Sequence, residues 1–182
     1  MILCAGRMET FSFALPIGVG LIESAINLTR LCLLDPPKSL VFLGTAGSYG
    51  ELKPLDLVTS RGAANLELAF LENKAYTPLD NVVMSESPIV SHETIINSSN
   101  YITTDSDTAK GYLGHGIGGE NMEFFSILSV AKAFDIPAAG IFCITNYCNR
   151  SAHEEFKTNH KAAMEKLEAY ARTHLISPKN RA

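Results

Sequence analysis

The sequence predicts an α/β domain of three layers, in which helices cover both faces of a mixed, partly barrel-like central sheet. Two observations carry this prediction. Short apolar runs typical of buried strands alternate with longer segments of helical periodicity. Several short β-like segments also lie in the middle of the chain, which indicates a mixed sheet rather than a plain dinucleotide-binding unit. No Gly-x-Gly-x-x-Gly sequence opens a helix after the first strand, and there is no P-loop.

The N-terminal half opens with apolar runs that predict two short strands, and its first helix is bounded by a glycine loop and by Asp35-Pro36-Pro37. The expected elements are strands at 2–5, 11–15, 39–43 and 57–60 and a helix at 21–34. A glycine-rich turn, Gly44–Gly50, follows the third strand directly. Backbone N–H groups in such a turn can meet an anion or a ligand oxygen, although most such turns only reverse the chain.

The C-terminal half reads as short strands, a capped helical turn, a glycine loop, and then a helix, a buried strand and a final helix. The expected elements are a helical piece at 66–71, strands at 82–84 and 88–91, a helical turn at 103–110, a loop at 111–119, helices at 124–134 and 152–174, and a strand at 138–145. Because there is no repeat or low-complexity segment, we expect one domain over residues 1–176 and a polar tail at 177–182.

Composition excludes several classes of protein. The chain has 182 residues, 46% of them hydrophobic and 19% charged, which is typical of an ordinary folded domain. The formal net charge of -4 gives no reason to expect nucleic acid or an acidic membrane as a partner. There is no long apolar span, and the first residues do not resemble a signal peptide. The cysteines have no metal-ligand spacing, so we expect buried thiols, no metal site and a cytoplasmic location.

Two polar residues stand at positions where an α/β sheet carries its ligands. Glu123 lies at the start of an apolar helix, and Asn146 lies at the end of an apolar strand. Both can face the crevice beyond the carboxyl ends of the strands. A carboxylate that accepts from sugar hydroxyls and an amide that both donates and accepts would suit a nucleoside. The alternative is a carboxylate favoured by the helix dipole and an asparagine that only forms a turn.

Four segments then resemble the nucleoside phosphorylase/nucleosidase family in their order along the chain: Phe42–Gly47, Ile89–Asn97, Asn121–Glu123 and Ile144–Asn146. The chain is identified as a shortened member, with the missing part expected between the first strand and Pro16. The resemblance implies cleavage of the N-glycosidic bond of a nucleoside, by phosphate in phosphorylases and by water in nucleosidases. It also implies a homo-oligomer, either a dimer or an assembly of dimers.

The resemblance also implies a role for each matching residue. Glu123 would grip the ribose hydroxyls, with Met122 packed under the ribose and Asn121 beside it. Asn146 would bind the base, and Ile95 stands where the family has a base-stacking aromatic residue. Since an amide can accept from N7–H and donate to O6, Asn146 favours a 6-oxopurine such as inosine or guanosine.

The nucleophile is the open point of the resemblance. Arg7, Gly6 and Thr45 would bind phosphate in a phosphorylase, whereas Glu9 would place a water molecule in a nucleosidase. The arginine that phosphorylases carry before the glycine turn is absent, because Phe42 and Leu43 stand there.

The leading hypothesis is a purine nucleoside phosphorylase that uses inorganic phosphate as co-substrate and no cofactor, and that releases the free base and ribose 1-phosphate. The first alternative is a hydrolytic nucleosidase acting on methylthioadenosine, S-adenosylhomocysteine or a related nucleoside. The second is a catalytically weak relative that only binds a nucleoside.

Overall fold

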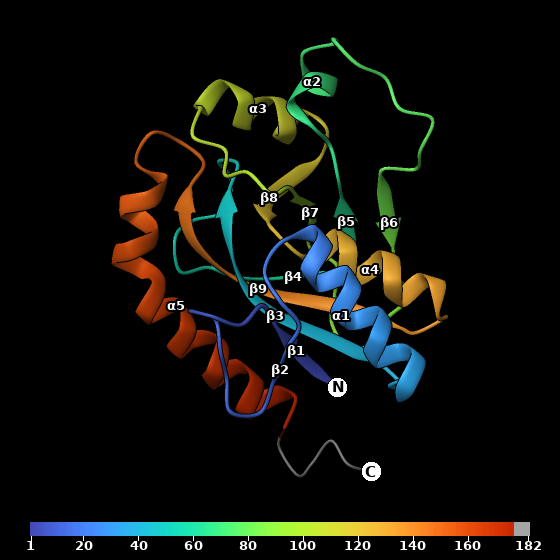
Figure 1. Ribbon diagram of the computed structural model, residues 1–182. Coiled ribbons are helices and arrows are strands. Elements are labelled where there is room, and N and C mark those ends of the chain that lie inside the picture. Colours follow the sequence, from blue (N-terminus) through green and yellow to red (C-terminus); the bar gives the residue numbers. More distant parts are fainter. Residues whose placement is uncertain (177–182) are drawn as a thin grey trace.

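The computed structural model describes residues 1–176, so the tail predicted at 177–182 lies outside the described residues. A mixed sheet forms the central layer (Figure 1). The helices α1 (Leu21–Leu34) and α4 (Phe124–Ala133) lie side by side on one face, and α5 (Ala152–His174) lies on the other. The predicted three-layer α/β fold is therefore confirmed. The sheet curves but is not closed into a barrel.

The sheet has nine strands in the described part of the chain. They are β1 (Ile2–Cys4), β2 (Leu15–Pro16), β3 (Leu40–Ser48), β4 (Leu57–Ser60), β5 (Gly62–Ala64), β6 (Val82–Met84), β7 (Ile95–Ser98), β8 (Ile117–Asn121) and β9 (Ala138–Tyr147). The main path runs β2-β1-β3-β8-β7-β5-β6, and β9 lies along the other edge of β3, followed by β4. The long strands β3 and β9 are parallel, whereas β3 and β8 are antiparallel.

Aromatic side chains fill the core between the sheet and the α1/α4 layer. Phe42, Phe124 and Phe142 are fully buried, and their ring centroids lie 5.1 to 6.5 Å apart. Aromatic pairs at this separation stabilise a core beyond the area they bury. This packing holds the start of α4 against β3 and β9, which are the strands that carry the predicted site residues Thr45 and Asn146.

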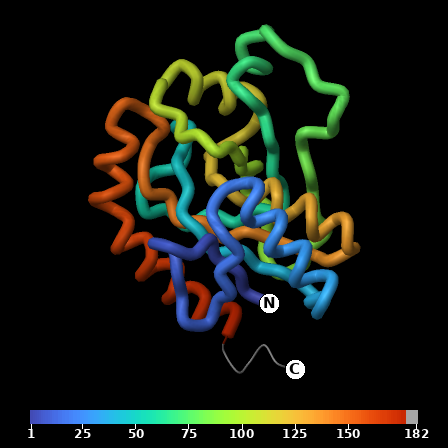
Figure 2. Tube along the Cα trace, in the orientation of Figure 1, coloured from blue at the N-terminus to red at the C-terminus, as the bar shows by residue number. Residues whose placement is uncertain are grey.

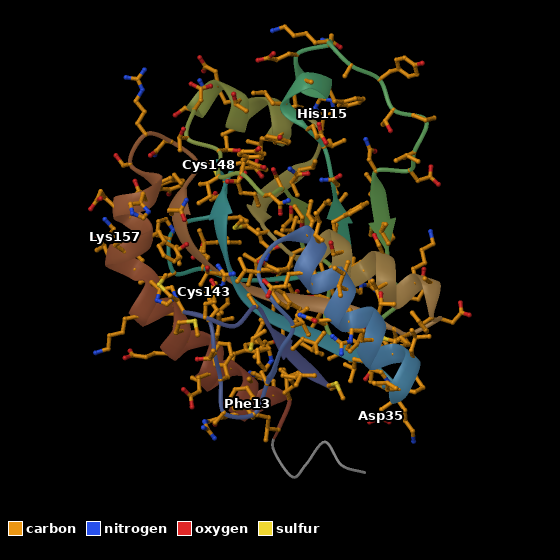
Figure 3. All side chains as sticks on the ribbon, viewed as in Figure 1. Phe13, Asp35, His115, Cys143, Cys148 and Lys157 are labelled. Atoms are coloured by element: carbon orange, nitrogen blue, oxygen red, sulfur yellow. The ribbon has the colours of Figure 1, made fainter. Side chains whose placement is uncertain are left out.

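A second apolar cluster lies between the sheet and α5, and Figure 3 shows Cys143 of β9 facing that helix. A third lies at the end of the sheet under α3 (Ser106–Gly114) and the short α2 (Leu68–Leu71), where the rings of Tyr49 and Tyr112 stack 4.5 Å apart. The segment from α2 to β6 extends outward at this end of the molecule (Figure 2).

Two segments read as loops are strands in the structure. The expected turn at 44–50 is mostly the second half of β3, and the expected loop at 111–119 is divided between α3 and β8. The glycines in β3 serve close packing instead of a turn: a Cβ at Gly44 would lie 2.7 Å from the Phe42 ring, and one at Gly47 would lie 2.9 Å from Cys148 Sγ. The expected strand at 11–15 is reduced to Leu15–Pro16, and 88–91 forms no strand.

One edge of β3 is left without a strand partner at its centre. β1 pairs with β3 only as far as Leu43, and β8 pairs with it only from Gly47 onward. The unpaired backbone edge of residues 44–46 therefore faces the space between the end of β1 and the start of α4. Such a gap, where neighbouring strands diverge, is the usual place for a ligand in an open α/β sheet.

All four cysteines are buried free thiols, and Cys148 lies near α3 at the end of β9 (Figure 3). Within residues 1–176, no helix has both the length and the apolar composition needed to cross a lipid bilayer.

Candidate active site

A cavity of about 400 Å³ fills the gap beside β3. This volume lies within the range of small-molecule sites. Its walls come from the turn after β1, the centre of β3, the end of β8, the start of α4, the end of β9 and the start of α5. Glu9, Thr45, Glu123 and Asn146 all line it, so residues far apart in the sequence are brought together as predicted.

Glu9 occupies the unpaired edge of β3. Its carboxylate accepts hydrogen bonds from the Thr45 hydroxyl and from the Thr45 backbone N–H, the latter at 3.1 Å. The N–H would otherwise have bonded a neighbouring strand, and the carboxylate takes that place. A two-residue turn fixes Glu9, because Gly6 and Glu9 exchange both backbone hydrogen bonds at 3.0 Å. Arg7 within this turn has φ 55, an uncommon conformation for a residue with a side chain.

Glu123 lies at the N-cap position of α4 and is 4% exposed. One oxygen accepts from the backbone N–H of Gly20 at 2.9 Å, and the other accepts from Asn121 Nδ2 at 2.6 Å. Asn121 Oδ1 in turn accepts from the N–H groups of Glu123 and Phe124, so one side chain both caps the helix and orients the carboxylate. Met122, between them, also lines the cavity.

Asn146 is held with its amide in a defined orientation. Its Oδ1 accepts from the Thr145 hydroxyl at 2.8 Å, and its Nδ2 donates to the Tyr147 carbonyl at 3.1 Å. An amide oxygen has a second lone pair and an amide nitrogen a second proton. One acceptor site and one donor site therefore remain for a ligand in the cavity.

Arg7 and Gly6 line the cavity but are engaged elsewhere. The Arg7 guanidinium lies 3.7 Å from the Glu23 carboxylate, and its side chain is 74% exposed. The Gly6 N–H donates to the Glu9 carbonyl.

Burial raises the pKa of both site carboxyls, Glu9 and Glu123. Burial, then the nearby charge of Glu9, raises the pKa of Glu123 to about 7, although the hydrogen bonds from Gly20, Met122 and Asn121 oppose this. Burial also raises the pKa of Glu9, against its hydrogen bonds from Thr45 and the charge of His160. Raised pKa values in a cleft are typical of groups that exchange protons in catalysis.

Ile95 is not among the residues that line the cavity. It lies in β7 and packs against the Tyr49–Tyr112 cluster instead. Large side chains that the sequence did not single out also line the cavity, among them Tyr101, Ile102, Glu120 and Phe156. Tyr101 and Ile102 lie on an irregular segment after β7, and Phe156 lies on the first turns of α5. Phe156 could have been found from the sequence, because an apolar residue on the inner face of an amphipathic helix is expected to be directed toward the interior. Tyr101 and Ile102 lie in an irregular segment, and no local sequence pattern indicates that they line a cavity.

Comparisons with known proteins identify the family of the chain. A sequence model of the Phosphorylase superfamily matches residues 3–176, so the chain belongs to this superfamily of nucleoside-cleaving enzymes. No curated protein sequence matches.

Solved structures similar to the chain include three bacterial enzymes or putative enzymes. A Helicobacter pylori methylthioadenosine/S-adenosylhomocysteine nucleosidase variant with methylthioadenosine in its active site has a TM-score of 0.82 at 14% identity, covering 96% of each chain. The futalosine hydrolase of the same organism has 0.80 at 15% identity, again covering 96% of each chain. A putative nucleosidase of the first kind from Francisella philomiragia has 0.82 at 12% identity, covering 96% of this chain and 97% of its own. At these identities the likeness shows the fold.

Proposed function

We propose that the protein is a hydrolytic nucleosidase, which uses water to cleave the N-glycosidic bond of a purine nucleoside. One observation carries this proposal: the hydroxyl and N–H of Thr45 both donate to the Glu9 carboxylate. These are the donors that a phosphorylase would offer to phosphate. A carboxylate in that place repels a phosphate dianion and suits the activation of water. The leading hypothesis from the sequence, phosphorolysis, is therefore replaced by its first alternative.

The charge of the cavity supports the same choice. Three carboxylates line it, those of Glu9, Glu120 and Glu123, while Arg7 pairs with Glu23. Negative charge disfavours a phosphate dianion and stabilises the positive charge that develops on the ribose as the glycosidic bond breaks.

In the proposed reaction the water oxygen bonds to C1′ of the ribose while the C1′–N bond breaks and its electron pair leaves with the base. Glu9 accepts one water proton, which is later released to solvent, and the departing base takes up one proton from solvent. Glu123 accepts hydrogen bonds from the ribose hydroxyls, and Met122 packs under the sugar. These groups match the roles that the family resemblance implies.

The substrate class follows from Asn146. Its free donor site fits O6 of a 6-oxopurine, and its free acceptor site fits the N7–H that forms when the departing base takes up a proton. An amide cannot act as a general acid toward a 6-aminopurine. We therefore propose a 6-oxopurine nucleoside. Inosine and futalosine are the nucleosides to assay first, the second because a structurally similar enzyme is a futalosine hydrolase. Methylthioadenosine, bound by another similar enzyme, is the 6-amino competitor.

The decisive experiment titrates phosphate. Purified protein is incubated with each nucleoside at increasing phosphate, and both free base and sugar product are measured. We expect base release without phosphate, the free sugar rather than its 1-phosphate as product (ribose in the case of inosine), and a loss of about 10²-fold or more in Glu9→Gln. Arg7→Ala should leave turnover within about twofold. Release that requires phosphate and yields ribose 1-phosphate would restore the phosphorylase hypothesis.

The proposal also includes a homo-oligomer in the cytoplasm, as the sequence predicts. Ile22, Ile26 and Leu33 along one side of α1 are 69%, 54% and 70% exposed and offer an apolar contact. The buried free thiols agree with a reducing compartment.

A further inference from the structure

Glu120 is a buried carboxylate to which the proposed reaction assigns no contact with the substrate. It lies in β8, is 7% exposed and lines the cavity. A buried carboxylate is stable only when donors surround it. Two oxygens here accept from one residue of a distant loop: Oε1 from the Thr103 N–H at 2.8 Å, and Oε2 from the Thr103 hydroxyl at 2.6 Å. Tyr49 donates its hydroxyl to Oε2 at 2.8 Å.

The loop attached to Glu120 borders the cavity. We define it as the cover segment, residues 99–103, between β7 and α3. At one end, Asn100 Oδ1 accepts from the Leu21 N–H at 3.0 Å, next to the Gly20 N–H that binds Glu123. At the other end, Thr103 is held by Glu120. Between these attachments lie Tyr101 and Ile102, which line the cavity although they are 84% and 59% exposed.

The attachment at Thr103 lies on the base side of the cavity. A Cβ at Gly47 would lie 3.1 Å from Asn146 Nδ2 and 3.5 Å from Glu120 Cγ, so both side chains flank the same glycine. The cover segment therefore runs from the Glu123 side, where the sugar is expected, to the Asn146 side, where the base is expected. Two large side chains at its centre have little to pack against until a ligand fills the cavity.

Glu120 itself is rigidly placed. It lies in a strand that pairs with β3 at Gly47 and with β7 at Asn97. The Tyr49 ring that donates to it stacks on Tyr112 at 4.5 Å with an interplanar angle of 9°. The Glu120 carboxylate therefore fixes the Thr103 end of the cover segment to the sheet. Among the described residues, no other hydrogen bond joins that end to the sheet.

We propose that Glu120 is a positioning residue for nucleoside binding, which holds the cover segment through Thr103 so that Tyr101 and Ile102 close over the bound nucleoside. This inference rests on the proposed function. A loop that is already fixed in its binding position loses less conformational entropy when the ligand arrives. Releasing Thr103 should therefore raise KM more than it lowers kcat, because Glu9 and Glu123 keep their own partners.

The test compares Thr103→Val with Thr103→Ser. Valine keeps the shape and removes the hydroxyl that donates to a charged acceptor, so we expect KM for the preferred nucleoside to rise about tenfold with kcat within about threefold. Serine keeps the hydroxyl and should restore KM to within about twofold. The matched control is Thr108→Val, which removes a similar hydroxyl–carboxylate bond, to Asp105 at 3.0 Å, outside the cavity. It should leave both constants unchanged.

Glu120→Gln provides the second arm. If Glu120 acts through Thr103, KM in the double variant with Thr103→Val should rise by much less than the product of the two single-variant increases. Hydrogen exchange of residues 99–103 supplies a readout independent of activity: it should accelerate in Thr103→Val and remain slow in Thr103→Ser and Thr108→Val.

Unchanged exchange together with unchanged KM in Thr103→Val would overturn the proposal, as would a fall in kcat at constant KM. If the wild type cleaves no nucleoside, the proposed function fails instead, and the exchange data still decide whether Glu120 holds the cover segment.

Discussion

At the scale of single residues, the site is governed by two carboxyls that share one cavity. Burial raises the pKa of both, and the nearby charge of Glu9 raises the pKa of Glu123 as well. Such a pair titrates as a unit, so its pH dependence reports on both groups together. The proposed reaction requires both in the ionised form, Glu9 to accept a proton and Glu123 to stabilise charge on the ribose.

This requirement predicts an acidic limb in the pH profile. Because the pKa of Glu123 is raised to about 7, the active ionised form is depleted below that pH. We expect log(kcat/KM) to rise with pH through about 7 and to level off above it, as measured by initial rates at fixed ionic strength. Glu123→Gln should be at least 10²-fold less active on the plateau. A rate constant that does not change between pH 5.5 and 8 would argue against this role.

A second residue-scale prediction concerns the base. Asn146→Asp replaces an amide that binds O6 and N7–H with a group that repels O6 and can donate a proton to N7. We expect the ratio of kcat/KM for inosine over that for methylthioadenosine to fall at least tenfold. Parallel assays of both nucleosides measure this ratio. If it does not move, Asn146 does not contact the base.

At the scale of elements, the starts of two helices converge on Glu123. Gly20, the N-cap residue of α1, donates its N–H to one carboxylate oxygen, and Asn121, just before α4, donates to the other. Since α1 and α4 pack against each other, their N-termini are held together at the cavity. The positive ends of both helix dipoles thus support an ionised Glu123 and partly offset its burial.

Asn121→Asp tests this arrangement. Aspartate can still cap α4 through its carboxylate, but it loses the amide that donates to Glu123 and adds a negative charge beside it. We expect the acidic limb to move to higher pH by one unit or more, as seen in the kcat/KM profile. Asn121→Ser keeps a capping oxygen without adding charge, so its limb should move less. If the acidic limb moves equally in the two variants, the negative charge added at position 121 does not determine the pKa of Glu123.

At the scale of the whole molecule, the sequence predicts most of the layer structure. Helices α1 and α5 have the predicted bounds because periodic apolar positions and terminal signals agree there. The predictions for the glycine-rich stretches at 44–50 and 111–119 are wrong because glycine is locally compatible with both turns and strands. The strands that pair with β3 and β8 are distant in the sequence, and they decide which of the two forms.

In the candidate site, too, residues within sequence motifs were predicted, whereas a residue whose role depends on a distant segment was not. Glu9, Thr45, Glu123 and Asn146 follow from motif order, and the structure places them in one cavity. Glu120 was not predicted, because its role depends on a loop that a single sequence does not place beside it.

The last prediction links the site to the stability of the whole chain. The folded-state pKa of Glu123 is raised from 4.5 to about 7, so the native state binds this proton more tightly than the unfolded state does. The resulting stabilisation is fully present below about pH 4.5 and is lost as pH rises through about 7, a change of ~3 kcal/mol. Glu9 acts in the same direction, because its pKa is raised too. The ligand-free protein should therefore lose stability between pH 5 and pH 8.

Glu123→Gln removes one of these two contributions. The Tm of the variant minus that of the wild type should become more positive by several degrees between pH 5 and pH 8, although the variant is nearly inactive. Thermal unfolding followed by circular dichroism at both pH values measures the difference, and Glu154→Gln, on the exposed face of α5, is the control in which the difference should stay small. If the difference in Tm between Glu123→Gln and the wild type is the same at pH 5 and pH 8, the pKa of Glu123 is not raised in the folded protein. A growing separation would show that the cavity keeps a carboxylate ionised at a cost to stability, as expected for a group retained for chemistry rather than for folding.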